Sequence, residues 1–168
     1  LVTVLDAILS RYHIVDSVII AGETESQFRY NERWIPVYQE LFSNVYDRIK
    51  EKHPDVQFGN SFALHQVLDK NLKHIVSDLS IGDFVAFSYA PTDILNEIVK
   101  TPDDAIDDLE KTFEIIPNKK IGFFEMSWST SEFVSGDSVS QKLFLEKLFD
   151  FYAQNESEIE FLTWYRYY

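Results

Sequence analysis

The chain has no cysteine, and this absence excludes several kinds of chemistry at once. A disulfide framework, a thiolate nucleophile and a cysteine-ligated metal site would all need that residue. Long apolar runs are also missing, since no stretch approaches the ~20 apolar residues that a membrane-spanning helix requires. We therefore expect no membrane insertion. The compartment stays open, with secretion or the cell surface among the options.

Basic residues are scarce. The chain has 15 Lys and Arg against 28 Asp and Glu, which gives a formal net charge of −13. Such a charge repels phosphate backbones and anionic lipid, so we expect no nucleic-acid partner. A neutral ligand suits this charge better, and the 15% aromatic content supplies rings that fit the apolar faces of sugars.

Signals for cofactors and metals are lacking as well. No glycine-rich loop follows a predicted strand, which excludes the usual nucleotide-binding form of an open sheet. The four histidines show no metal-ligand spacing. The acidic residues between 103 and 110 lack the glycine turn of a calcium loop and are expected to form a solvated helix face. We therefore expect neither a cofactor nor a metal.

Strand and helix patterns alternate along the whole chain. The predicted strands cover residues 15–21, 56–62, 83–89, 121–125 and 160–164. The predicted helices cover 1–12, 34–52, 66–79, one or two within 93–113, the second opening at Thr101-Pro102, and 140–153. Strict alternation predicts one α/β domain over residues 1–168 with a parallel sheet. A doubly wound sheet and an eightfold barrel both fit this pattern.

Two apolar segments end on a glutamate. They are Val18-Ile-Ile-Ala-Gly-Glu23 and Ile121-Gly-Phe-Phe-Glu125. An apolar run that stops at a charge is typical of a buried parallel strand that delivers one acid to the rim of the sheet. Two such strands place two acids near one point, as glycosidic bond cleavage requires: one carboxyl protonates the leaving oxygen and the other attacks the anomeric carbon.

The chain resembles the C-terminal half, strands four to eight, of the retaining (β/α)8-barrel glycoside hydrolases called clan A. Related barrels end strand four in Gly-Asn-Glu, which Gly22-Glu23 matches at the glutamate, and strand seven in Glu-x-Gly-Trp, which Glu125-Met-Ser-Trp128 matches at its first and last residues. The resemblance implies that Glu125 is the nucleophile and Glu23 the acid/base. It also implies a partial barrel of about five parallel strands with outer helices, a carbohydrate substrate, and an N-terminal barrel half elsewhere in the full chain.

Further residues agree with this resemblance. Phe87-Ser-Tyr89-Ala-Pro91 keeps the tyrosine and proline that end strand six in such enzymes, which implies that Tyr89 orients the nucleophile. Trp164 matches the tryptophan that closes strand eight and floors the sugar subsite. Trp128 is a further substrate-binding candidate. His65 is another, since it lies just beyond a predicted strand end.

Some alternatives stay open. Gly22 stands where the family has an asparagine that contacts the sugar 2-hydroxyl, and Glu25 would replace Glu23 if the strand slipped by two residues. The leading hypothesis is retaining hydrolysis of a neutral oligo- or polysaccharide. A non-catalytic carbohydrate-binding protein on the same barrel is the first alternative. An α/β scaffold that binds an unrelated small molecule is the second.

Overall fold

The computed structural model describes residues 1–93 and 95–165. It contains one sheet of five strands in the order β1-β2-β3-β4-β5, and every neighbouring pair is parallel. The strands are β1 (Ser17–Ile19), β2 (Gln57–Ala63), β3 (Phe84–Tyr89), β4 (Lys120–Met126) and β5 (Ile159–Trp164). The predicted α/β fold with a parallel sheet is therefore confirmed.

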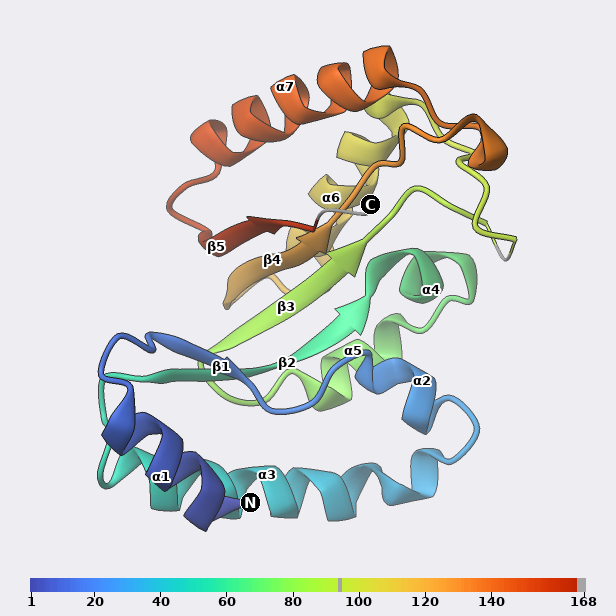
Figure 1. Ribbon diagram of the computed structural model, residues 1–168. Coiled ribbons are helices and arrows are strands. Elements are labelled where there is room, and N and C mark those ends of the chain that lie inside the picture. Colours follow the sequence, from blue (N-terminus) through green and yellow to red (C-terminus); the bar gives the residue numbers. More distant parts are fainter. Residues whose placement is uncertain (94, 166–168) are drawn as a thin grey trace.

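The sheet curls, and the helices lie on its outer side. In Figure 1, α7 lies above the sheet, while α1 and α3 lie below it. The helices are α1 (Val2–Arg11), α3 (Ile35–Lys50), α4 (Leu64–Asp69), α5 (Lys73–Leu79), α6 (Pro102–Ile115) and α7 (Ser138–Gln154). The result is a curled half-barrel, which is consistent with a partial barrel.

The core lies between the sheet and the helices. The largest cluster includes Phe62, Phe87 and Phe123, together with buried residues of α4 to α7. A second cluster joins α1 and α3 to Phe58 of β2. The one buried amide of β2, Asn60, accepts a hydrogen bond from the Tyr38 hydroxyl (2.5 Å) and donates one to the Leu79 carbonyl (3.0 Å), so its burial is compensated.

Aromatic rings pack together on the opposite face of the sheet. Phe84 and Phe161 meet edge to face, with ring centroids 5.4 Å apart. Gly122 lies beneath this pair, because a Cβ at this position would come within 2.4 Å of the Phe161 ring. The absence of a side chain at Gly122 therefore lets the ring of β5 lie over β4.

The structure differs from the expected elements in three places. The helix predicted for 66–79 is two helices, α4 and α5, with Asn71 between them at φ 52°, a conformation that asparagine tolerates well. The expected loop 22–31 contains the short helix α2 (Thr24–Phe28). The strand expected over 15–21 covers only Ser17–Ile19. One or two helices were expected within 93–113, and in the described part of this range the α-helix found is α6, which begins at Pro102 as expected.

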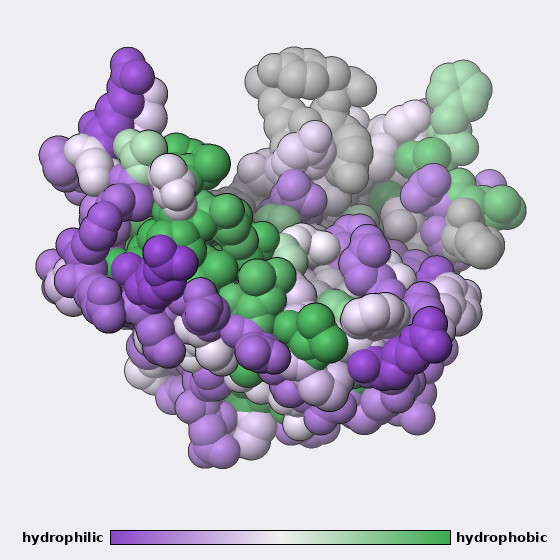
Figure 2. All heavy atoms as spheres, turned by 90° about the horizontal axis from the view of Figure 1, so that it is seen from below, coloured by the Kyte–Doolittle hydropathy of each residue, from purple (hydrophilic) through white to green (hydrophobic). Residues whose placement is uncertain are grey.

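One side of the molecule carries a patch of exposed apolar side chains. Figure 2 looks from below in the orientation of Figure 1, from the side of α1 and α3, and shows this patch among polar side chains near the middle of the face. The large apolar side chains exposed on these helices include Val4, Ile8, Val37 and Leu41. We call these four residues the apolar patch. Among the described residues, no helix has the length and apolarity needed to cross a membrane.

Candidate active site

A cavity of about 630 Å³ lies at the carboxyl ends of the strands. Its lining comes from the turn after β1, the start of α4 and the loops after β3 and β4. It is lined by Glu23, His65, Ser88, Tyr89, Ala90, Pro91, Thr92, Asn96, Glu125, Ser127, Trp128, Ser129, Ser131 and Val134. Five of the predicted site residues are among them, and the volume falls in the ~300–1,000 Å³ range of small-molecule sites.

Glu125 reaches this cavity through an irregularity in β4. The pairing of β4 shifts register on both sides, between Phe87 and Tyr89 of β3 and between Phe123 and Met126 of β4 itself. One extra residue of β4 lies between these pairs, which is a β-bulge, and Glu125 within it has φ 52°. A bulge re-aims a side chain that strict alternation would place elsewhere. The Glu125 side chain is exposed at the end of its strand.

Glu23 is held by the end of the neighbouring strand. It precedes α2 with φ 45° and ψ 49°, and its N–H donates to the Ser61 hydroxyl (3.2 Å). The next residue, Thr24, is buried and donates its hydroxyl to the Ser61 carbonyl (2.9 Å). The turn that presents Glu23 is thus attached to the carboxyl end of β2, while the Glu23 side chain stays exposed.

Both glutamates have a left-handed backbone conformation. In the described part of the chain, the non-glycine residues with positive φ are Glu23, Asn71, Asn96, Glu125 and Ser135. Asparagine tolerates this conformation, whereas for most other L-residues it costs roughly 1–2 kcal/mol. Such strain gathers at functional sites, where the surrounding structure enforces it. The two glutamates chosen from sequence are both strained in this way.

Glu25, the alternative acid, occupies a different environment. Its side chain is only 1% exposed, and it is not among the residues that line the cavity. Its Oε2 accepts a hydrogen bond from the Ala63 N–H (3.2 Å), while its Oε1 has no hydrogen-bond partner in the described residues. Burial raises the pKa of Glu25 to about 7. Of the two acids, Glu23 is the one at the cavity.

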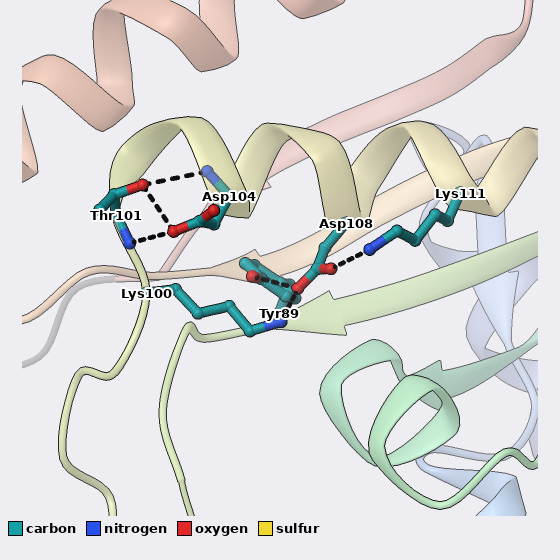
Figure 3. Close-up of polar contacts among 6 residues, drawn as sticks. All are labelled: Tyr89, Lys100, Thr101, Asp104, Asp108 and Lys111. Carbon is teal, nitrogen blue, oxygen red and sulfur yellow. Dashed lines mark hydrogen bonds and ion pairs between the residues drawn. The ribbon is translucent and has the colours of Figure 1, made fainter.

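Tyr89 lines the cavity, but its hydroxyl is directed to α6. It donates to the Asp108 carboxylate (2.9 Å), as Figure 3 shows. Burial raises the pKa of Tyr89, and the adjacent Asp108 charge raises it further. The hydrogen bonds of the described residues do not include the expected one from Tyr89 to Glu125. In this structure Tyr89 connects β3 to α6.

Asp108 is a buried anion with three donors. Besides the Tyr89 hydroxyl, it receives the ammonium groups of Lys111 (2.8 Å) and Lys100. Burial acts to raise the pKa of Asp108, but these three hydrogen bonds outweigh that effect and lower it. The carboxylate therefore stays ionised beneath the cavity, and it joins the loop before α6 to the helix itself (Figure 3).

His65 and Trp128 each present an unpartnered nitrogen. The His65 Nδ1 and Trp128 Nε1 atoms are buried and have no hydrogen-bond partner in the described part of the chain. Burial lowers the pKa of His65, which favours the neutral imidazole. Trp128 is 4% exposed, and its ring packs on Phe144 of α7 at 5.0 Å. Unsatisfied buried polar groups are rare, so both nitrogens are candidates to bind a ligand or water.

Trp164 lies apart from the cavity. Its ring is half-buried and packs on Phe144 of α7, with centroids 6.1 Å apart. It is not among the residues that line the cavity. The expected sugar-subsite tryptophan is thus part of the layer between β5 and α7 in this structure.

Several polar residues of the cavity were not identified from the sequence. Ser88 is the second-to-last residue of β3, Ser127 directly follows β4, and Asn96 lies in the loop after β3. The position of the two serines next to strand ends is a signal that could have selected them. Asn96 had no such signal, because its segment was expected to be helical. In the described residues, no cluster of histidine and acidic side chains could hold a metal ion.

Comparison of the chain with protein-family models, with curated proteins and with solved structures finds no match. The evidence for function is therefore the geometry of the cavity and the chemistry of the residues that line it.

Proposed function

We propose that this chain belongs to a retaining glycoside hydrolase that cleaves a neutral oligo- or polysaccharide. The observation that supports this most is the placement of Glu23 and Glu125. Glu23 follows β1, and Glu125 lies near the carboxyl end of β4, a strand that is not a neighbour of β1. Each has a strained backbone, and both line one cavity. Such an enzyme needs two carboxyl groups that face the same bound substrate.

The proposed reaction is a double displacement. The Glu125 carboxylate attacks the anomeric carbon while Glu23 gives its proton to the departing glycosidic oxygen. Glu23 then takes a proton from water, which attacks the same carbon and releases Glu125. This reaction requires a carboxyl separation of ~5–5.5 Å with substrate bound. The unpartnered nitrogens of His65 and Trp128 would bind sugar hydroxyls.

We further propose that additional strands complete a (β/α)8 barrel. In the described residues, β1 pairs only with β2, and β5 pairs only with β4. Open sheet edges favour unwanted pairing, and natural proteins normally cover them. The apolar patch on α1 and α3 lies on the side of β1 and supports the same proposal.

A non-catalytic carbohydrate-binding protein is the alternative. The observation that favours it is Gly22, which replaces the asparagine that in similar enzymes contacts the sugar 2-hydroxyl. That contact belongs to a group of interactions that contribute several kcal/mol in the transition state. A Cβ at Gly22 would meet only the Ser61 hydroxyl, at 3.7 Å, so Gly22→Asn fits and is expected to raise turnover in an enzyme.

Turnover on a panel of aryl glycosides tests the proposal. Glu125→Gln and Glu23→Gln should each lower kcat by ~10²-fold or more, because each removes a group that acts in the transition state. Glu132→Gln is the matched control, since Glu132 does not line the cavity. Sugar binding without turnover in the wild-type protein, unchanged in Glu125→Gln, would favour the alternative.

A further inference from the structure

Glu25 is a buried carboxyl that the proposed reaction does not use. It is 1% exposed, although it follows the exposed Glu23 by only two residues. One of its oxygens accepts the Ala63 N–H, and the other has no partner in the part of the chain that the structure describes. Burial of a carboxyl group that makes only one hydrogen bond costs free energy. We therefore expect the Glu25 carboxyl to have a role in the protein.

Three consecutive residues attach this turn to β2. Glu23 donates its N–H to the Ser61 hydroxyl, and Thr24 donates its hydroxyl to the Ser61 carbonyl. Glu25 accepts the N–H of Ala63, two residues further along the strand. Of these three attachments, only that of Glu25 depends on an ionisable side chain.

Charged residues flank Glu25 at both ends of α2. Glu23 precedes the helix and disfavours ionisation of Glu25, whereas Arg29 follows the helix and favours it. Arg29 is itself held by Gln66 of α4 (3.3 Å), and its Nε has no partner in the described residues. Helix α5 also packs against α2 and contributes the titratable residues Lys73, His74 and Asp78. Glu25 is thus coupled to the acid/base residue both through the backbone and through charge.

We propose that Glu25 is a positioning residue: its carboxyl fixes the turn before α2 against the end of β2 and so holds Glu23 at the cavity. The inference rests on the proposed function. Loss of the carboxyl would leave the Ala63 N–H buried without an acceptor and release a turn that is held at φ 45° at Glu23. Glu23 would then move away from the cavity. Glu125 and the cavity residues of the other loops would keep their positions.

Two substitutions of Glu25 test this role through turnover. Glu25→Gln keeps an acceptor for the Ala63 N–H, whereas Glu25→Leu has none. We expect Glu25→Leu to lower kcat at least ~10-fold with less than ~3-fold change in KM, because proton transfer by Glu23 occurs in the transition state. Glu25→Gln should stay within ~3-fold of wild type at pH 6, as a retained hydrogen bond predicts. If Glu25→Gln is as inactive as Glu23→Gln, Glu25 acts as the acid itself and the positioning role is wrong.

Amide hydrogen exchange supplies a readout that needs no turnover. The Ala63 amide should exchange at least ~10-fold faster in Glu25→Leu and at the wild-type rate in Glu25→Gln, since exchange reports local opening. Far-ultraviolet circular dichroism confirms that each variant is folded. If the wild-type protein turns over no glycoside, the proposed function fails, and this exchange pattern still decides the role of Glu25. Unchanged Ala63 exchange in a folded Glu25→Leu protein would overturn it.

Discussion

At the scale of single residues, the site depends on backbone conformations that a sequence pattern does not reveal. Apolar runs that end at Glu23 and Glu125 selected two glutamates that line the cavity, because strand ends and hydrophobic patterning are local properties. The left-handed conformations of both residues follow from contacts with β2 and from the pairing of β3 with β4. Those contacts are set by the tertiary fold, so they could not be predicted.

The strain at Glu125 is measurable. Glycine adopts positive φ without the steric cost that alanine pays, so Glu125→Gly should be more stable than Glu125→Ala by about 1 kcal/mol. Glu160 of β5 is also exposed and does not have a positive φ. There the order should reverse, with Glu160→Gly less stable than Glu160→Ala by roughly 0.5–1 kcal/mol. Urea unfolding gives all four values. If the Gly and Ala variants have the same order of stability at both positions, Glu125 is unstrained.

Glu25 should make stability depend on pH. Its pKa is about 7 in the folded protein against 4.5 for the free side chain. A raised pKa means that the protonated carboxyl favours the folded state below about pH 4.5, and that this contribution is lost as the pH rises through 7. The loss is on the order of 3 kcal/mol between pH 4 and 8. Glu25→Gln should remove this component from urea unfolding free energies, whereas Glu51→Gln, at an exposed position, should retain it.

At the scale of helices and strands, the sequence predicted most of what the structure contains. The long helices and all strands except the shortened β1 lie within a few residues of their predicted ranges, because each has its own apolar periodicity. Helix α6 begins at the Thr101 cap. The break between α4 and α5 was missed, since the apolar pattern continues through Asn71. Tyr89 was expected to serve Glu125. Its partner Asp108 lies on a helix whose position over β3 no local pattern specifies.

The contact between β3 and α6 gives a further prediction. Asp108 is 2% exposed, and its carboxylate accepts a hydrogen bond from Tyr89 and pairs with two lysines. Asp108→Asn therefore leaves these donors without an anion. Removing one partner of a buried ion pair costs ~3–5 kcal/mol, and partial exposure of the lysines reduces this to about 2–4 kcal/mol. Asp107→Asn, on the exposed side of α6, should cost less than ~0.5 kcal/mol. A loss below ~0.5 kcal/mol for Asp108→Asn in chemical denaturation would contradict this account.

At the scale of the whole molecule, the curl of the sheet creates the site. Residues that are about a hundred positions apart in the chain line one cavity, because parallel strands bring their carboxyl ends to one edge. Strand alternation predicted that edge, but both a doubly wound sheet and an eightfold barrel fitted the pattern. Packing between strands, such as that of Phe161 over Gly122, is set by tertiary contacts that the alternation of elements does not specify.

The apolar patch has consequences for association. Exposed apolar surface of this kind favours contact with other molecules, so we expect the chain to self-associate at high concentration. Leu41 is 54% exposed, and Leu41→Glu should weaken this association with little change in stability. Lys142→Gln changes the net charge equally, but on α7, and should have no such effect. Sedimentation velocity across a concentration series measures both. Equal association of the two variants would count against a role for the patch.

The central claim is that Glu125 is the nucleophile of a retaining glycosidase, and covalent trapping tests it most directly. 2-Deoxy-2-fluoro glycosides with an activated leaving group slow the second displacement and leave the sugar on the nucleophile. Peptide mapping by mass spectrometry after incubation should find one fluoroglycosyl group on Glu125, and none on the Glu125→Gln protein. A label on another residue, or no adduct with any sugar of the panel, would contradict the account.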